Sequence, residues 1–242
     1  MDAKTYLNTL FSVVDEINQS LLRAYARIYS VINGETLLEF GGGPAVFSLI
    51  SGAVRFQEIH FSDYDQGCLA EVLSWKNNEE KSFNWDKCIE YSLYVEKNKE
   101  LPKPVEVVER RKLIQSRISY LLTCDAFSDN LLLNSGYQRY TAVANNFCLD
   151  GITSDKGLWK SLNQKLMKLV SRNGWYVTST LLNARSWSID EKIYPAVFLK
   201  SEDIIDLFKN NGFSVEYLEV ITSSSRESYD GFIIAFGQKI LE

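Results

Sequence analysis

The sequence predicts one α/β domain over residues 1–242, with a mostly parallel seven-stranded sheet, one antiparallel strand and helices on both faces. Strand-like apolar runs alternate with segments of helical periodicity, the pattern of strands linked by crossover helices. A glycine turn directly follows the first strand-like run. The last two runs are joined by a loop too short for a crossover helix, which predicts that this pair is antiparallel.

The N-terminal 30 residues are expected to form a helical lid. Val14, Ile17, Leu21, Tyr25 and Ile28 recur at spacings of three and four, as they would on the buried face of an amphipathic helix. A strand over 36–40 follows. Three glycines and Pro44 then predict a tight turn and a helix over 45–50, because proline suits the first turn of a helix.

The other predicted elements are assigned by periodicity and by turn residues. The remaining strands are predicted over 58–62, 118–123, 140–144, 175–182, 213–221 and 231–236, and the helices over 67–75, 158–169 and 203–209. A charged helical insertion is expected over 86–117. Its interleaved signs favour a solvated face over a docking patch. Pro102 and Pro104 mark the only plausible internal linker, and 222–230 reads as a polar loop.

Charge and composition exclude several classes of partner. Lys and Arg number 26 against 31 Asp and Glu, so the net charge of −5 gives no attraction to nucleic acid or anionic lipid. The longest uncharged stretch, 40–54, is too short to span a membrane. No secretory signal is apparent at the N-terminus, and four scattered cysteines favour free thiols in the cytoplasm. The oligomeric state stays open, with a monomer favoured.

The only histidine, His60, lies in an apolar run and is interpreted as a strand residue. A histidine-built metal site or a Ser-His-Asp triad is therefore not expected, and no metal site is predicted.

The glycine turn and the end of the second strand point to a nucleoside ligand. Gly41 and Gly43 leave room for a ligand beside the backbone, and Asp63, twenty residues beyond Gly43, can accept both hydroxyls of a ribose. A dinucleotide fold would have a third glycine where Val46 stands, and Pro44 removes an N–H that a pyrophosphate would use. S-adenosylmethionine is thus favoured over NAD, and a nicotinamide-dependent reductase remains the alternative.

Four segments resemble the methyltransferases that act on nicotinamide, phenylethanolamine and thioethers. They are LLEFGGGPAVFSLIS at 37–51, SDY at 62–64, SFNW at 82–85 and FCLD at 147–150. The resemblance covers nearly the whole chain and implies a Rossmann-like class I methyltransferase fold. It also implies S-adenosylmethionine as the cofactor and a small-molecule acceptor.

The resemblance assigns cofactor contacts position by position. The glycine turn would lie under the methionine moiety, with an N-terminal lid tyrosine above it and an acid beneath its amino-acid end. Asp63 would hold the ribose, with residues beside the adenine and its amino group. The cofactor positions are Tyr6, Glu39, Gly41, Gly42, Gly43, Asp63, Tyr64, Cys68, Asp125, Ala126 and Asn146. Cys68 stands where the family has a ribose-binding asparagine, so that contact departs from the pattern.

The acceptor side departs further, because the acids that follow the fifth strand in amine-handling members are replaced by Thr180 and its neighbours. Arg185 and Trp187 favour an acceptor with an anionic or carbonyl group and a flat ring, unless Arg185 points to solvent. Phe147 would line the same pocket. Asp150 would hold or deprotonate the acceptor atom, or else cap a loop.

Together these residues predict a metal-independent enzyme that methylates a nitrogen of a small amine or heterocycle. O-methylation is the alternative because the amine-directed acids are missing. A non-catalytic adenosyl-binding protein is the alternative from another class.

Overall fold

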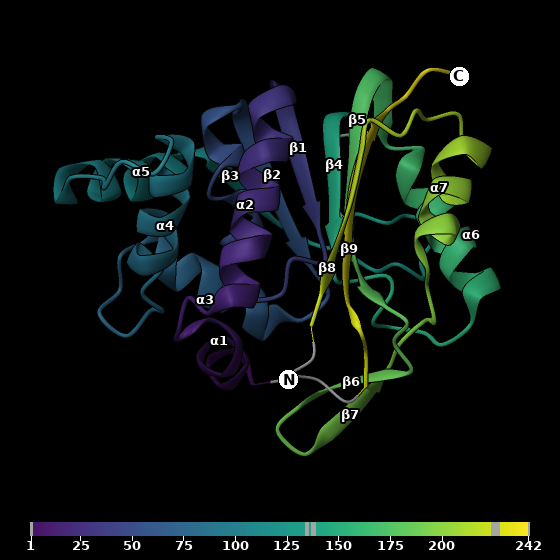
Figure 1. Ribbon diagram of the computed structural model, residues 1–242, viewed down its shortest axis with the longest axis horizontal. Helices are drawn as coiled ribbons and strands as arrows, with labels where there is room; N and C mark the ends of the chain where they lie inside the picture. Colours follow the sequence, from purple (N-terminus) through teal and green to yellow (C-terminus); the bar gives the residue numbers. More distant parts are fainter. Residues whose placement is uncertain (1, 134–135, 137–138, 224–227, 242) are drawn as a thin grey trace.

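A seven-stranded sheet runs through the centre of the computed structural model, which describes residues 2–133, 136, 139–223 and 228–241 (Figure 1). The strands lie in the order β3-β2-β1-β4-β5-β9-β8, and only β9 runs antiparallel to its neighbours. The strands are β1 (Gly34–Phe40), β2 (Phe56–Asp63), β3 (Ile118–Thr123), β4 (Tyr140–Asn146), β5 (Val170–Leu182), β8 (Tyr217–Thr222) and β9 (Gly231–Gln238). The predicted fold class is confirmed.

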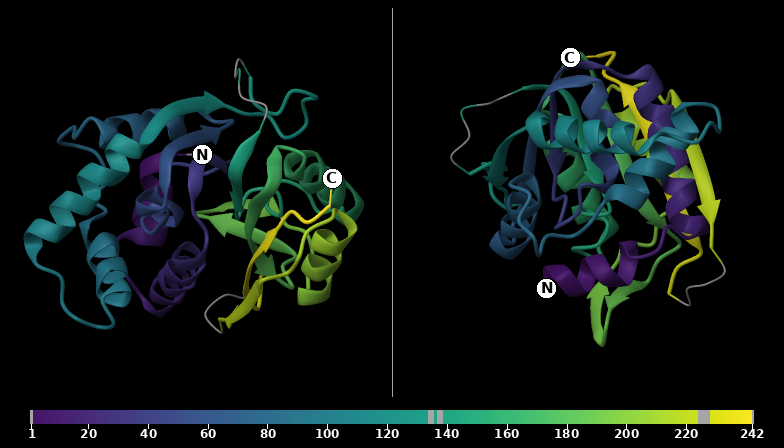
Figure 2. Two further views of the ribbon diagram at one scale, coloured as in Figure 1. Left: turned by 90° about the horizontal axis from the view of Figure 1, so that it is seen from above. Right: turned by 90° about the vertical axis from the view of Figure 1, so that its left-hand side faces the viewer.

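Helices cover both faces of this sheet. Five lie on one side and two on the other, and a separate apolar cluster fills the space on each side (Figures 1 and 2). The first group is α1 (Ala3–Phe11), α2 (Glu16–Val31), α3 (Gln66–Lys76), α4 (Asp86–Glu96) and α5 (Pro104–Arg117); the second is α6 (Lys156–Met167) and α7 (Ser201–Asn210).

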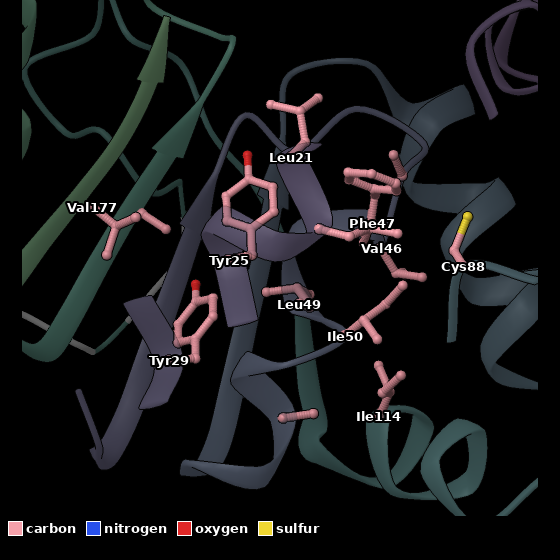
Figure 3. Packing of buried hydrophobic residues seen from close by; sticks show 14 of the residues in the cluster. Leu21, Tyr25, Tyr29, Val46, Phe47, Leu49, Ile50, Cys88, Ile114 and Val177 are labelled. Carbon is pink, nitrogen blue, oxygen red and sulfur yellow. The ribbon is translucent and has the colours of Figure 1, made fainter. Parts of the chain in front are cut away.

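Helix α2 supports the turn that follows β1. Its predicted apolar stripe is buried, and Asp15 caps its N-terminus by accepting a hydrogen bond from the backbone N–H of Asn18 at 2.8 Å. Figure 3 shows Tyr25 of α2 near Phe47 and Leu49, which follow the glycine turn, and the ring centroids of Tyr25 and Phe47 are 6.2 Å apart. The backbone that shapes the turn is therefore held from behind by a packed helix.

The helix predicted over 45–50 is replaced by two short 3₁₀ turns, η1 (Phe47–Leu49) and η2 (Gly52–Val54). Every residue from 44 to 53 is buried, so the segment has no solvent-exposed face. A Cβ on Gly52 would lie 3.0 Å from the ring of Tyr29, which shows how closely α2 confines this backbone. Tertiary packing has overridden the local helical signal.

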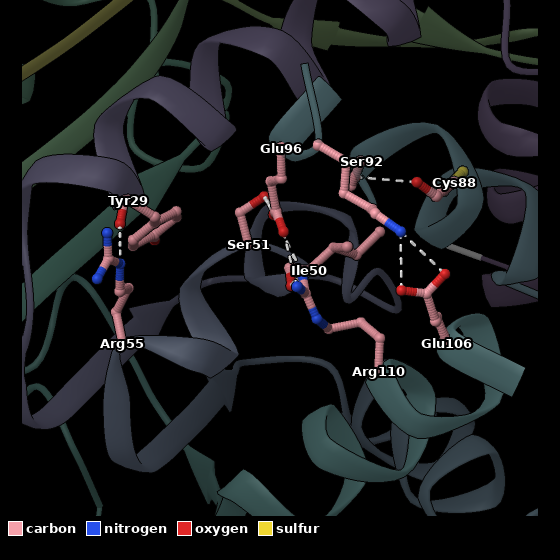
Figure 4. Close-up of polar contacts among 10 residues, drawn as sticks. Tyr29, Ile50, Ser51, Arg55, Cys88, Ser92, Glu96, Glu106 and Arg110 are labelled. Carbon is pink, nitrogen blue, oxygen red and sulfur yellow. Dashed lines mark hydrogen bonds and ion pairs between the residues drawn. The ribbon is translucent and has the colours of Figure 1, made fainter. Parts of the chain in front are cut away.

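The charged insertion consists of α4 and α5, and several of its charges are paired (Figure 4). Glu96 accepts hydrogen bonds from the hydroxyl of Ser51 and from Arg110, both at 2.6 Å, and Arg110 also donates to the carbonyl of Ile50 at 3.1 Å. The prediction of a simply solvated face is thus wrong for these residues, which fasten the insertion to the 3₁₀ turns. Pro104 is the first residue of α5 and begins that helix.

A second small sheet was not predicted. It is the hairpin of β6 (Ser186–Ile189) and β7 (Lys192–Pro195), which projects beyond the main sheet near α1 (Figure 1). The polar loop predicted over 222–230 is described except for residues 224–227, which lie outside the described ranges.

His60 is buried within β2, where its Nδ1 lies 3.1 Å from the hydroxyl of Tyr140, as expected of a strand residue. Within the described ranges, no group of three or more His, Cys, Asp or Glu side chains is arranged to hold a metal ion. No described helix has the length and apolar character needed to cross a lipid bilayer.

Candidate active site

Four strand ends meet at one edge of the sheet and form the candidate site. Because β3, β2, β1 and β4 are parallel neighbours, the segments after them lie side by side. These segments are 41–43 after β1, 63–64 at the end of β2, 125–126 after β3 and 146–147 at the end of β4. Apart from Tyr6 in α1 and Cys68 in α3, the cofactor residues expected from the sequence are thereby brought to this edge, the place where open α/β sheets bind ligands in a crevice.

Two glycines of the turn have positive φ, but the space around their Cα atoms differs. Gly41 has φ +67°, and a Cβ there would lie 2.1 Å from the sulfur of Cys148. Gly43 has φ +61°, but a Cβ there would meet no atom of the described structure within 4 Å. Gly41 therefore has a packing role, whereas Gly43 borders open space.

Asp63 ties the turn to the end of β2. Its Oδ2 accepts a hydrogen bond from the N–H of Gly43 and its Oδ1 accepts one from the N–H of Asp65, both at 2.8 Å. Burial raises the pKa of Asp63, and these backbone donors oppose the shift. Each carboxylate oxygen keeps a second lone pair for a ligand hydroxyl.

The other crevice residues differ in exposure. Tyr64 is 72% exposed at the rim, Asp125 is half-buried, and Ala126 is buried. Cys68 is buried in α3, and burial raises the pKa of its thiol to about 12. The thiol is therefore neutral and a weak hydrogen-bond partner, unlike an asparagine amide.

A buried polar chain runs beneath the turn. Asn146 donates from its amide nitrogen to Glu39 at 3.0 Å, and its amide oxygen accepts from the hydroxyl of Ser179 at 2.8 Å. The hydroxyl of Tyr25 lies 2.9 Å from that of Ser179. Burial raises the pKa of Glu39 to about 7, and hydrogen bonds from Asn146 and Ser48 oppose the shift.

Tyr6 of α1 stands between this crevice and a second cavity. Burial, with the nearby Cys68, Asp63 and Asp150, raises the pKa of its hydroxyl. Its ring lies 6.2 Å from that of Phe11, which in turn packs against Phe47 at 4.9 Å and Trp85 at 5.1 Å. These aromatic contacts hold α1 over the edge of the sheet.

The cavity beyond Tyr6 has a volume of about 150 Å³. Its walls are mainly aromatic and aliphatic, with two carboxylates, and no lysine or arginine lines it within the described part of the chain. The aromatic residues that line it are Tyr6, Phe11, Phe147, Trp187, Tyr229 and Phe232. Phe147 has φ +57°, which is unusual for a bulky side chain and is typical of functional sites.

Asp150 is the buried carboxylate of this cavity, with 1% exposure. Its Oδ2 accepts a hydrogen bond from the N–H of Leu181 at 2.8 Å. Its Oδ1 is buried and has no hydrogen-bond partner among the residues that the structure describes. Burial raises the pKa of Asp150 to about 7.

Trp187 forms one wall of the cavity and is fixed from two sides. Its indole N–H donates to the carbonyl of Gly151 at 2.9 Å, and its ring stacks on Tyr194 with centroids 4.4 Å apart and planes 17° apart. Gly151 directly follows Asp150. The hairpin thus connects the indole wall to the loop that carries the buried carboxylate.

Two residues expected at the acceptor side lie outside the cavity. Thr180 alternates along β5 with Ser179 and Leu181, so its buried side chain points to the opposite face from the cavity. Arg185 is exposed and does not line the cavity. The anionic or carbonyl acceptor that Arg185 favoured therefore loses its basis, and the solvent-facing interpretation agrees with the structure.

Comparison with known proteins gives concordant matches. The NNMT/PNMT/TEMT family model matches residues 1–239. The chain belongs to this family. Human nicotinamide N-methyltransferase is 25% identical over 215 residues, covering 88% of this chain and 80% of that protein. Mouse indolethylamine N-methyltransferase is 22% identical, covering 98% and 92%. A SAM-dependent methyltransferase structure from Methanosarcina mazei has a TM-score of 0.59 at 10% identity, covering 89% and 98%.

As a member of the NNMT/PNMT/TEMT family, the protein is an enzyme that transfers a methyl group from S-adenosylmethionine to a small-molecule acceptor. The family match and the predicted resemblance agree over nearly the whole chain, so the predicted family is confirmed.

Several cavity residues of this family member were not predicted from the sequence. Tyr229 and Phe232 come from the loop before β9 and from β9 itself, and Asp15 and Asn18 come from the start of α2. Tyr194 is not among the lining residues, but its ring stacks on Trp187, which does line the cavity. The alternation of Trp187 and Ile189 before the Asp190–Glu191 pair was the one available signal for the hairpin.

The two glycines should respond differently to an added methyl group. Gly43→Ala should stay folded, with a loss of about 1–2 kcal/mol because of its left-handed φ. Gly43→Ala should weaken S-adenosylhomocysteine binding at least tenfold, because the added Cβ enters the open crevice.

Gly41→Ala should lower Tm further than Gly43→Ala does, because the added Cβ clashes with Cys148. Thermal unfolding and calorimetry measure both effects; unchanged affinity in folded Gly43→Ala would contradict the assignment of the crevice.

Tyr194 should act on the acceptor through Trp187. Tyr194→Ala should raise the acceptor KM roughly twofold to tenfold, the range expected for loss of an aromatic pair, and leave S-adenosylhomocysteine affinity unchanged. Tyr194→Phe keeps the stacked ring and serves as the matched control. Steady-state kinetics and calorimetry separate the two effects, and a Phe variant as impaired as the Ala variant would refute a stacking role.

Proposed function

We propose that this enzyme methylates a neutral nitrogen on a single-ring aromatic or heteroaromatic amine. The observation that carries the proposal is the unpartnered Oδ1 of Asp150, buried in the wall of an aromatic cavity. A buried carboxylate oxygen without a partner is unfavourable, and an N–H of the acceptor would satisfy it.

The size and charge of the cavity support this class of acceptor. A cavity of about 150 Å³ accepts a benzene-sized ring. Its aromatic walls suit a flat ring. Because Asp15 and Asp150 line it without a described lysine or arginine, an anionic acceptor would be buried beside like charge.

The strand-end crevice would hold S-adenosylmethionine, which supplies an electrophilic methyl group bound to a sulfonium. The open space at Gly43 and the free lone pairs of Asp63 support a methionine and a ribose position there. We assign Tyr64, Asp125 and Ala126 to the adenine end. Cys68 would contact the ribose side only weakly, because its thiol is neutral.

The methionine end would lie near Tyr6, Gly41 and Asn146. The amide of Asn146 is already engaged by Glu39 and Ser179, so its role is to position the edge of β4 and keep Glu39 satisfied. Gly42 belongs to this turn, where its N–H donates to the carbonyl of Ser62 at 3.1 Å.

The residues of this chain act mainly by positioning. Holding two reactants at attack distance lowers a barrier by about 7–11 kcal/mol in well-oriented systems. Phe147 and Trp187 would hold the acceptor ring and keep water away, and their apolar surroundings disfavour a protonated amine. Oδ1 of Asp150 would accept an N–H, aim the nitrogen lone pair, and receive the proton that the methylated nitrogen releases.

The same carboxylate could deprotonate a hydroxyl group, so O-methylation is tested alongside N-methylation.

The four cysteines are unpaired, which supports a reducing cytoplasm as the compartment. We keep a small molecule as the only proposed partner.

The test uses purified enzyme with labelled S-adenosylmethionine and one ring scaffold bearing an amine, a phenol or a carboxylate. Mass spectrometry should find a methylated amine. A product from the phenol or the carboxylate alone would refute N-methylation. Failure with a broad amine and hydroxyl library despite cofactor binding would favour a non-catalytic adenosyl-binding protein.

Asp63→Ala should weaken S-adenosylhomocysteine binding roughly tenfold to a hundredfold, because it removes charged acceptors for the ribose hydroxyls. Asp65→Asn is the control: it keeps the cap that Asp65 provides to the N–H of Gly67 and should change affinity less than twofold. Calorimetry measures both, and equal affinities in the two variants would exclude the ribose assignment.

Asp150 should control the pH dependence of turnover. Its pKa of about 7 means that the carboxylate forms as pH rises through 7, so kcat/KM for a weakly basic arylamine should rise from pH 6 to 8. Asp150→Asn should give a flat profile and a rate lower by about 10²–10⁴.

Stability provides the control for this variant. The raised pKa means that ionisation of Asp150 costs folding stability as pH rises from its unfolded pKa, near 4, to about 7. The Asn variant keeps an oxygen for the N–H of Leu181 and should be at least as stable as wild type at pH 8. A surviving pH dependence in a folded variant would show that another group titrates.

A further inference from the structure

We infer that the acceptor carries a second nitrogen, protonated and held by Asp15, so that the substrate class is an aromatic or heteroaromatic diamine. This inference rests on the proposed function. In the bound diamine, the neutral nitrogen would lie at Asp150 and the cationic nitrogen would lie at the solvent-facing end of the same cavity.

Asp15 lies in the connection between α1 and α2 and lines the cavity together with Asn18 and Phe11. It is exposed, whereas Asp150 is 1% exposed. One carboxylate therefore marks the inner end of the cavity and the other marks its mouth. The ring of an acceptor would lie between them, against the aromatic walls.

The neighbours of Asp15 leave its charge available to a ligand. Its Oδ1 accepts the N–H of Asn18, a backbone donor that does not neutralise it. The side-chain amide of Asn18 donates both of its protons elsewhere, to the carbonyl of Leu10 at 2.8 Å and to that of Val13 at 2.9 Å. No lysine or arginine lines the cavity in the ranges that the structure describes.

The two ends of the cavity therefore favour different groups on a ligand, a hydrogen-bond donor at one end and a cation at the other. The buried Oδ1 of Asp150 needs a hydrogen-bond donor, because it has no other partner in the described structure. The exposed carboxylate of Asp15 attracts a cation without requiring its complete desolvation. Phe11 lines the same cavity, and an aromatic ring near the cationic nitrogen would add a favourable environment for it.

The experiment compares three acceptors on one benzene ring that carries an arylamine. The second substituent is an aminomethyl group, which is protonated at neutral pH, or a methyl group, or a carboxylate. Wild type should favour the aminomethyl compound over the methyl compound by about fivefold in kcat/KM, the upper range for an exposed ion pair. The preference should shrink in 0.5 M salt, which screens exposed charges.

Asp15→Asn removes the charge and keeps an oxygen that can cap α2. It should abolish the preference, because kcat/KM for the aminomethyl compound should fall toward that for the methyl compound. Asp155→Asn is the matched control, because Asp155 caps α6 in the same way, through the N–H groups of Gly157 and Leu158, and does not line the cavity. It should keep the preference.

Equal use of the aminomethyl and methyl compounds by wild type, or a preference that survives in Asp15→Asn, would overturn the inference. Neither result would contradict the proposed N-methylation. If no arylamine is methylated at all, the proposed function itself fails.

Discussion

The hydrogen bond from the N–H of Gly43 to Oδ2 of Asp63 is the contact on which the site depends. It joins the turn after β1 to the end of β2, two parallel strands whose last paired residues are Phe40 and Ser62. The bond orients the carboxylate toward the crevice and fixes the left-handed backbone of the turn. Because that backbone has no Cβ at Gly43, the space beside it stays open.

Three buried acids lie around this edge in different states of satisfaction. Asp63 receives two backbone N–H groups, and Glu39 receives hydrogen bonds from Asn146 and Ser48, so both have partners without a ligand. Asp150 has one oxygen satisfied by Leu181 and one without a described partner. Each oxygen of Asp63 has a donor and keeps a second lone pair for a ligand hydroxyl, whereas Oδ1 of Asp150 has no described donor. In the proposed function Asp150 therefore gains most from an acceptor that brings an N–H.

Local patterns predicted the strands of the main sheet, the glycine turn and the place of Asp63 at the end of β2, because periodicity and turn chemistry act over a few residues. They failed where tertiary packing decides. The segment 45–50 contains the 3₁₀ turn Phe47–Leu49 because α2 confines it. Thr180 faces away from the cavity because side chains alternate along β5, and both faces of that strand are buried there, so burial alone does not predict which face a residue takes. The exposure of Arg185 and the place of Asp15 at the cavity follow from segments that meet only in the folded chain.

The two halves of the site have different origins in the chain. The crevice is built on the ends of β1 to β4. The cavity is closed by α1 and the start of α2, which are adjacent in sequence, and by the β6–β7 hairpin, which lies far from them along the chain. The bond from Trp187 to Gly151 connects the hairpin to the loop of Asp150, so these added segments also position the carboxylate. Changes in the hairpin can therefore alter the acceptor while the strand ends stay the same, whereas changes in α1 would reach both halves through Tyr6.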